Sequence, residues 1–73
     1  MTFNDAFAAK LRGERAKADI TQRELAELLD VSVTSIFRWE DGSTIPNFKT
    51  VYDIAEALDC TPNDLCPSPK EVA

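Results

Sequence analysis

The sequence predicts an all-α fold, a compact domain of five helices. Its 73 residues are about half a typical domain length, so the core must be built from neighbouring segments of the chain. Only 2 Gly and 4 Pro interrupt a chain rich in Ala, Leu, Glu and Lys/Arg, which are strong helix formers. Apolar residues recur every three or four positions, as on one face of a helix, and no segment alternates as a strand does.

The expected helices are separated by short turns. They cover Asn4–Ala18, Thr21–Leu29, Ser32–Glu40, Asn47–Leu58 and Thr61–Leu65. Residues 1–66 are expected to form the folded domain. The Pro-containing tail, residues 67–73, is expected to be disordered.

The first helix is predicted by a stripe of apolar residues. Phe3, Phe7 and Leu11 recur every four residues and would lie on one face. Asp19 is expected at the end of this helix, between it and the next.

The second and third helices have clear start signals. Thr21 and Glu24 have the spacing of a capping box, in which each side chain binds the other residue's backbone N–H. Ser32 is a typical N-cap, and Asp30 lies where the chain must turn. Both helices are too short to be stable alone in water, so each must pack against the other and against the flanking helices. Two such helices joined by a tight turn form a helix-turn-helix, whose second member can enter a major groove.

The fourth and fifth helices follow a loop that contains Pro46. Asn47 is predicted to cap the fourth helix, whose apolar residues keep helical spacing as far as Leu58. Thr61 followed by Pro62 combines an N-cap with proline at the first helical position, which starts the fifth helix.

The net charge of −5 is unevenly distributed along the chain. Residues 1–38 carry six basic and six acidic side chains, whereas residues 39–73 carry two basic and seven acidic ones. An acidic protein is a poor general partner for nucleic acid. Any anionic partner is therefore expected to meet the N-terminal half.

Composition argues against several classes of protein. The chain has no His and no cluster of nucleophile, base and acid, so we expect no enzymatic activity. Cys60 and Cys66 are too few for a secreted disulfide scaffold or a four-ligand zinc site. Cys60 is expected at an apolar position, and Cys66 to be exposed and reduced. No metal, cofactor or small-molecule ligand is evident.

The N-terminal segment lacks the basic and then apolar pattern of a signal peptide, and no apolar run is long enough to span a membrane. We therefore expect a cytoplasmic protein without a membrane partner.

The chain resembles the lambda-repressor-like (Xre-type) helix-turn-helix family over Phe7 to Leu65. The resemblance rests on Gln22-x-x-Leu25-Ala26-x-x-Leu29-x-Val31-Ser32-x-x-x-Ile36-x-x-Trp39-Glu40-x-Gly42, followed by Pro46, Ile54-Ala55-x-Ala57-Leu58, Thr61 and Leu65. It implies a helix-turn-helix made by the second and third helices. It also implies double-stranded DNA as partner and a homodimer on the DNA. Dimerisation fits a second consideration, since one recognition helix reads too few base pairs to specify a site in a genome. The surface around Asn47–Cys66 is the expected dimer contact.

The resemblance also implies which residues meet the base edges. They are Ser32, Val33, Thr34, Phe37 and Arg38. Arg38 can bind guanine O6 and N7 with two hydrogen bonds, while Val33 and the Thr34 methyl suit a thymine methyl. Val33 and Phe37 could instead pack in the core. Because Ile36 already supplies the inward position, we favour outward exposure.

Phosphate contacts are implied for a second set. It consists of Thr21, Gln22, Arg12, Lys17, Arg23 and Ser43. Gln22 would meet a phosphate oxygen at the start of the second helix, where the helix dipole favours an anion. Thr21 can act both as a cap and as a phosphate contact. The three basic side chains are equally well explained as solvated surface charges.

The resemblance implies a structural role for Arg15 and Glu40. In related domains an Arg at this place in the first helix pairs with the Glu after the recognition helix. Such a two-point ion pair would fix the angle between the first and third helices.

Four features depart from the family pattern. Asp30 and Asp19 replace residues better suited to a left-handed backbone, where glycine is usual. Asp41 stands where Asn is common, and the loop Ser43-Thr44-Ile45 has no basic residue. These changes keep the fold but predict weak, salt-sensitive DNA binding.

Two functions therefore remain open, besides an enzyme, which is much the weakest candidate. The first is a sequence-specific transcriptional regulator, a small phage- or plasmid-type repressor acting as a dimer on a palindromic operator. The second is a protein-interaction module of the same fold, such as an antitoxin or antirepressor, with weak DNA binding. The acidic charge of residues 39–73 favours this alternative.

Overall fold

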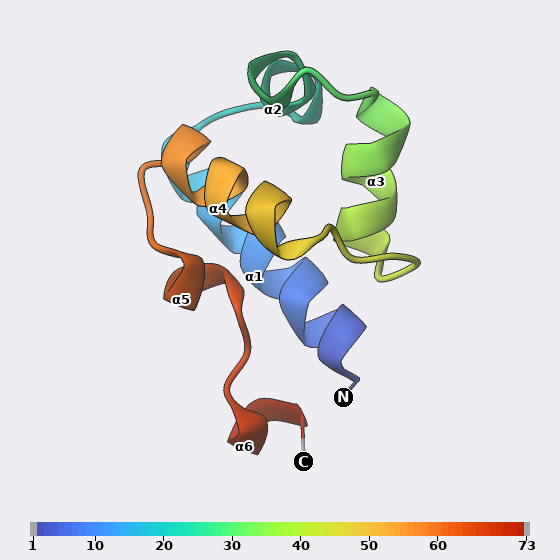
Figure 1. The fold of residues 1–73 in the computed structure, drawn as a ribbon, viewed down its shortest axis with the longest axis vertical. Helices are drawn as coiled ribbons and strands as arrows, with labels where there is room; N and C mark the ends of the chain where they lie inside the picture. The colour runs from blue at the N-terminus through green and yellow to red at the C-terminus, as the bar shows by residue number, and fades with distance from the viewer. Residues whose placement is uncertain (1, 73) are drawn as a thin grey trace.

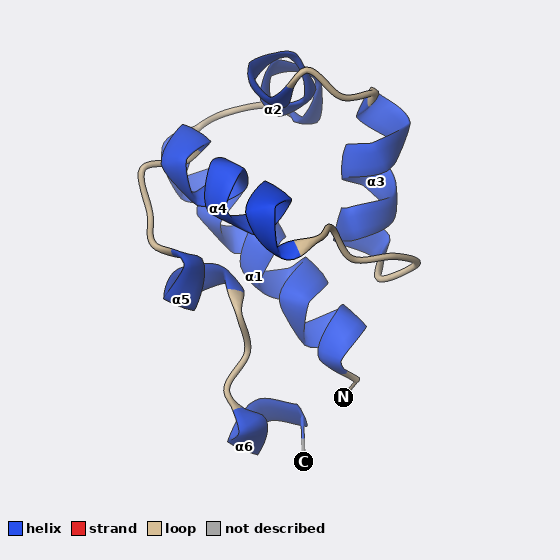
Figure 2. Ribbon diagram, in the orientation of Figure 1, coloured by secondary structure: helices blue, strands red, loops and turns tan. Residues whose placement is uncertain are grey.

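The structure, a computed structural model, describes residues 2–72 and consists of helices joined by loops, with no strand in that range (Figure 2). The helices are α1 (Phe3–Ala18), α2 (Gln22–Leu29), α3 (Val33–Asp41), α4 (Phe48–Ala57), α5 (Pro62–Leu65) and α6 (Pro69–Val72). The first five follow the predicted order, which confirms the all-α lambda-repressor-like fold. None of these helices is both long and apolar enough to cross a membrane.

The long helix α1 packs against α3 and α5, while α4 packs against α2 and α5. In Figure 1, α2 and α3 lie together at one end of the molecule. Each of the first five helices contributes a fully buried side chain to one core. These residues are Phe7 and Leu11 from α1, Leu25 from α2, Ile36 from α3, Ile54 from α4 and Leu65 from α5. Trp39 adds the largest side chain of the core.

The predicted caps are present. Thr21, Ser32 and Asn47 each accept a hydrogen bond from the backbone N–H three residues later, which satisfies one of the free donors of a helix start. Thr2 does the same for Asp5, a cap that the sequence analysis did not identify.

Three helix ends have aspartate in the left-handed backbone conformation. Asp19 and Asp30 have φ of 56° and 55°, as predicted, and Asp59 after α4 has φ of 56°. Gly42 ends α3 with φ of 85°, and a Cβ at this position would lie 2.8 Å from the Asp5 carboxylate. The left-handed backbone at this position favours glycine, whereas the exposed Asp5 side chain could move away from a Cβ.

The tail differs from expectation, because residues Pro69–Val72 form a single helical turn. The Ser68 N–H donates to the Glu71 carboxylate at 3.3 Å, and Lys10 of α1 lies 3.3 Å from the same side chain. Pro at the first helical position with Glu shortly after is a helix-start pattern. The expectation of disorder rests on the prolines around Cys66 and overlooks this start signal.

Candidate nucleic-acid interface

The helix-turn-helix is built from α2, a three-residue turn and α3. The turn begins at Asp30, whose N–H donates to the carbonyls of Ala26 and Glu27, and the Val31 N–H then binds the Ala26 carbonyl at 3.0 Å. The chain next reaches Ser32, the cap of α3. These bonds close α2 and start α3 within three residues, so the relative placement of the two helices is set locally.

The outer face of α3 exposes the residues that were predicted to meet base edges. Val33 and Phe37 are 39% and 56% exposed, and Thr34 and Arg38 are exposed beside them. Positions separated by three or four residues share a face of a helix, so these four side chains form one continuous surface. The opposite face of α3 is buried, through Ile36, Trp39 and Glu40.

Ser32 lies at the start of this surface but is occupied by capping. Its Oγ accepts from the Ser35 N–H at 3.2 Å and lies 3.1 Å from the Ser35 hydroxyl. Ser32 itself is exposed.

Arg15 and Glu40 form a two-point ion pair between α1 and α3. Arg15 Nε lies 2.6 Å from Glu40 Oε2, and Arg15 Nη2 lies 3.0 Å from Oε1. Arg15 Nη1 also donates to the Ile20 carbonyl at 2.9 Å. The Glu40 side chain is only 3% exposed, and its hydrogen bond raises the pKa of Arg15. This geometry fixes α3 against α1.

Two of the residues predicted to contact phosphate form hydrogen bonds with Glu40. Gln22 Nε2 donates to Glu40 Oε1 at 3.2 Å, and Arg12 Nη1 donates to the Glu40 backbone carbonyl. A buried carboxylate can accept several hydrogen bonds, and a buried acceptor that lacks a donor lowers the stability of the fold. Glu40 therefore connects α1, α2 and α3, a role that short-range patterns in the sequence do not reveal for Gln22 or Arg12.

The start of α2 is largely satisfied from within. The Thr21 N–H donates to Glu24 Oε1 at 3.0 Å, while the Thr21 hydroxyl accepts from the Glu24 N–H at 3.0 Å. The hydrogen bonds from Thr21 lower the pKa of Glu24. The Glu24 carboxylate therefore lies at the helix start where a phosphate was expected to bind. Arg23 is exposed on the first turn of α2.

Lys17 lies apart from the outer face of α3. Its Nζ pairs with Glu14 at 3.1 Å, and both side chains line a shallow surface hollow with Leu58 and Asp59, at the end of α4.

The loop after α3 is held by Asp41. The Ser43 N–H donates to Asp41 Oδ1 at 2.7 Å and to the Arg38 carbonyl at 3.1 Å. The Ser43 side chain first, and its N–H second, lower the pKa of the Asp41 carboxyl by hydrogen bonding. Asp41 thus has a local structural role that the sequence analysis missed. The Ser43 side chain remains exposed at the end of α3.

Within residues 2–72, one group of side chains has the composition of a metal site. Donor atoms of Glu14, Cys60 and Asp64 lie within 4.8 Å of one another. Both carboxylates already accept hydrogen bonds, from Lys17 and Thr61. Burial raises the pKa of the half-buried Cys60 thiol, which favours the protonated form. Cys66 is exposed, as predicted.

Comparison with known proteins supports the assignment of α2 and α3 as a helix-turn-helix. The helix-turn-helix family matches residues 11–65. The HTH-type transcriptional regulator DicA of Escherichia coli (strain K12) is 33% identical over 61 residues, which are 84% of this chain and 45% of DicA. Repressor protein C2 of Salmonella phage P22 is 34% identical over 56 residues, covering 77% of this chain and 26% of C2.

Solved structures show the same arrangement of helices. The clp gene regulator ClgR from Corynebacterium glutamicum superimposes with a TM-score of 0.84 and 29% identity, over 89% of this chain and 69% of ClgR. Hydroxypropylphosphonic acid epoxidase from S. wedmorenis matches with a TM-score of 0.83 and 25% identity, over 90% of this chain but 35% of the enzyme. The likeness to the epoxidase therefore concerns part of that enzyme only.

This chain spans less than half the length of DicA and of C2. The family match nevertheless covers most of the chain, including the helix-turn-helix and the helices that support it. The chain belongs to the lambda-repressor-like (Xre-type) helix-turn-helix family of DNA-binding proteins.

Proposed function

We propose that this protein is a sequence-specific transcriptional repressor of the phage or plasmid type, acting as a dimer on a palindromic operator. The observation that carries the proposal is the outer face of α3. Four exposed side chains, Val33, Thr34, Phe37 and Arg38, lie together on a helix that a buried ion pair fixes in place. A rigid helix with exposed apolar and guanidinium groups suits the thymine methyl and guanine edges of a major groove.

The proposed roles follow from position. Val33, Thr34, Phe37 and Arg38 contact base edges, with Ser32 at the start of the helix. Arg23 and Arg38 supply positive charge toward the DNA backbone. Thr21 and Ser43 offer hydroxyl groups at the two edges of the proposed interface. Gln22 acts mainly by positioning α2, since its amide is bound to Glu40.

No catalytic step, cofactor, metal or small-molecule ligand is part of this proposal, and a cytoplasmic location fits it. The repressors and regulators among the relatives support a regulatory role in transcription.

The alternative is a protein-interaction module with weak DNA binding. It is favoured by the seven acidic side chains of residues 39–73, which include Asp41 at the end of α3, and by Glu24 in the first turn of α2.

A binding selection from a random duplex pool at low salt separates the two functions. We expect enriched half-sites related by two-fold symmetry. Enrichment must be lost in a variant that combines Val33→Ala, Phe37→Ala and Arg38→Ala, whereas Leu28→Ala, at an exposed position of α2, is the matched control. No enriched motif from the wild-type protein would favour the interaction module.

A further inference from the structure

Three side chains with metal-binding groups come together where α1, the end of α4 and α5 meet. They are Glu14 of α1, Cys60 after α4 and Asp64 of α5, and one donor atom of each lies within 4.8 Å of those of the other two. A thiol with two carboxylates is a mixed set of ligands. Thiolate ligands favour Zn²⁺ and similar ions over Mg²⁺ and Ca²⁺, which take oxygen ligands.

The fold sets the position of each of these three residues separately. The Cys60 N–H donates to the Ala55 carbonyl at 2.9 Å, in the turn that ends α4. Asp64 is held at the start of α5, because the Thr61 N–H and hydroxyl donate to its Oδ2 at 2.9 and 3.1 Å. Glu14 lies within α1, and its side chain is only 16% exposed. The three donor groups therefore converge from three fixed segments of the backbone.

Both carboxylates keep one oxygen for a further ligand. Lys17 donates to Glu14 Oε2 at 3.1 Å, and the Thr61 donors bind Asp64 Oδ2. Within residues 2–72, no hydrogen bond reaches Glu14 Oε1 or Asp64 Oδ1. The Lys17 side chain is 75% exposed, so its ammonium group can move into solvent. These hydrogen bonds thus orient the carboxylates and leave acceptor capacity on each.

The charges around the Cys60 thiol favour a cation. Burial first, and then the carboxylates of Glu14, Asp64 and Asp59, raise the pKa of this thiol, and the Lys17 ammonium acts in the opposite direction. A thiolate alone is therefore disfavoured here. A divalent ion neutralises the thiolate and one carboxylate together, which removes the reason for the raised pKa.

The distances are close to those that a metal ion requires. Tetrahedral Zn²⁺ with bonds of about 2.0–2.3 Å places neighbouring donors about 3.4–3.6 Å apart. From separations of up to 4.8 Å, the donors need to approach by at most about 1.4 Å. Rotation of the exposed Asp64 side chain supplies movement of this size.

We infer that Glu14, Cys60 and Asp64 form a binding site for a divalent, thiol-binding metal ion of the Zn²⁺ class. Cys60 binds as the thiolate after its proton passes to solvent, each carboxylate supplies one oxygen, and water completes the coordination. The ion connects α1 to the segment between α4 and α5 and stabilises the folded chain. Two cysteines are too few for a four-cysteine site, and sequence spacing does not reveal this one, because Glu14 is distant from Cys60 along the chain.

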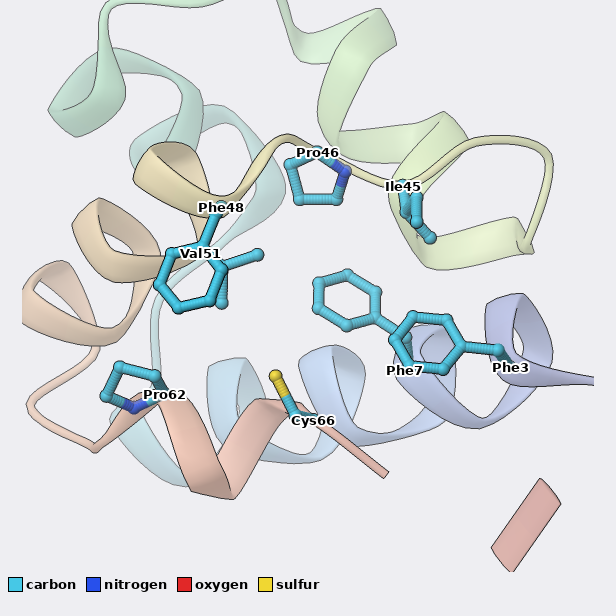
Figure 3. A pocket seen from close by; sticks show the side chains of 8 residues that line it. All are labelled: Phe3, Phe7, Ile45, Pro46, Phe48, Val51, Pro62 and Cys66. Carbon is cyan, nitrogen blue, oxygen red and sulfur yellow. The ribbon is translucent and has the colours of Figure 1, made fainter. Parts of the chain in front are cut away.

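The second cysteine provides an internal control. Figure 3 shows Cys66 at an apolar groove of about 230 Å³, together with Phe7, Phe48 and Pro62. Among the described residues, no charged side chain lines this groove. Cys66 is exposed but lacks, within this lining, the carboxylates that would complete a metal site.

Titration of the metal-free chain with Cd²⁺ tests the site directly, since a thiolate bound to Cd²⁺ absorbs in the ultraviolet. The wild-type protein and Cys66→Ser should show the same band, saturating at one ion per chain, whereas Cys60→Ser should lose it. Zn²⁺ should displace the Cd²⁺, and Mg²⁺ should not. The inference is overturned if the wild-type protein shows no band, or if Cys60→Ser keeps the band, which would indicate adventitious binding only.

The two carboxylates are tested by calorimetric titration with Zn²⁺. Glu14→Gln and Asp64→Asn keep the size of the side chain but remove its charge. Each should weaken binding by more than about tenfold, since even residues that only support a metal ligand are typically worth that much. Glu56→Gln, at an exposed position of α4 outside the cluster, is the matched control and should bind like the wild-type protein. Unchanged affinity in both cluster variants would overturn the inference.

Thermal unfolding gives a second readout. Zn²⁺ should raise the unfolding midpoint of the wild-type protein and of Cys66→Ser, because it binds the folded state, and should leave Cys60→Ser unchanged. An equal rise in Cys60→Ser contradicts the site. Circular dichroism of the metal-free variants establishes that they are folded, and if Cys60→Ser does not fold, Glu14→Gln and Asp64→Asn decide the question.

This inference goes beyond the proposed function and does not depend on it. The three ligands lie outside the outer face of α3, so binding to the selected duplex should be the same with and without Zn²⁺. DNA binding without metal binding overturns only the inference. Metal binding without an enriched DNA motif overturns only the proposed function.

Discussion

At the scale of single residues, Glu40 has the most consequential position. Its side chain is almost fully buried, and Arg15 and Gln22 satisfy its carboxylate. The net stability of a buried ion pair is small because desolvation offsets the attraction, but removal of one partner leaves an uncompensated charge. The pair therefore contributes chiefly to the fixed placement of α3.

The Arg15→Ala variant should be destabilised by about 3 kcal/mol, because Glu40 then remains buried without its cation. The double variant Arg15→Met with Glu40→Leu should recover much of that loss, since it removes both charges. Urea unfolding of the three proteins checks both statements. An unchanged midpoint for Arg15→Ala would contradict them.

Arg38 and Gln22 should have different effects on DNA binding. Arg38→Ala should cost about 1–3 kcal/mol on the selected site and reduce discrimination at one G·C pair. Arg38→Lys, which keeps the charge but loses the two-point geometry, is the control for simple charge. Gln22→Ala should weaken binding to all sequences alike, because it loosens α2 rather than a base contact. Titrations on selected and scrambled duplexes decide this, and equal losses for both alanine variants would refute the assignment.

At the scale of helices, the N-terminus of α2 couples stability to pH. Hydrogen bonds from the backbone N–H of Thr21 and within the capping box lower the pKa of Glu24 below its ordinary value of 4.5. A lowered folded-state pKa contributes stability above the unfolded-state value, and that contribution is lost as the pH falls through the folded-state value.

Glu24→Gln keeps a side-chain acceptor but removes the charge. The wild-type protein should exceed it in unfolding free energy at neutral pH, and the difference should shrink as the pH falls below 4.5. Glu27→Gln, at an exposed position of the same helix, is the control. A difference that stays constant from neutral to acid pH would show that the capping carboxylate does not titrate in this way.

Features that depend on residues close together in the sequence were the ones that the sequence predicted. Caps at Thr21, Ser32 and Asn47 depend on residues within four positions, so local patterns predicted them. The left-handed conformation of Asp30 was expected from the family resemblance. The exposed row on α3 followed from helical spacing once Ile36 was assigned to the core.

Contacts that bring distant segments together were harder to predict. The hydrogen bonds from Gln22 and Arg12 to Glu40 join positions 18 and 28 residues apart. No local pattern distinguishes such a side chain from one that is free to reach a phosphate. The Arg15–Glu40 pair was expected only because of the family resemblance.

At the scale of the whole molecule, few positive charges remain available for the DNA backbone. Arg12 is bound to the end of α3, and Lys17 is paired with Glu14 away from that helix. Arg23 and Arg38 are left at the proposed interface, and within residues 2–72 neither forms an ion pair. Hydroxyl groups and apolar contacts must therefore supply a larger share of the affinity than in a basic repressor.

The salt dependence of binding should reflect this shortage. Each neutralised phosphate contributes about −0.9 to the slope of log K against log salt, so two phosphate contacts per protomer predict a dimer slope of about −4, compared with roughly −10 for a strongly basic repressor. Titrations at several salt concentrations measure the slope. A slope as steep as that of the basic repressor would mean that other surfaces meet the phosphates.

Two substitutions at the end of α3 should move affinity in predictable ways. Asp41→Asn removes a charge that repels phosphate but keeps an oxygen for the Ser43 N–H, so binding to any duplex should tighten at low salt. Asp41→Ala, which also loses that hydrogen bond, shows how much the loop geometry matters. Ser43→Lys should tighten binding and steepen the dimer slope by about 1.8, one phosphate contact per protomer. A gain in affinity with an unchanged slope would mean that the introduced ammonium group binds elsewhere than a phosphate, and no gain from Asp41→Asn would place Asp41 beyond the reach of the DNA backbone.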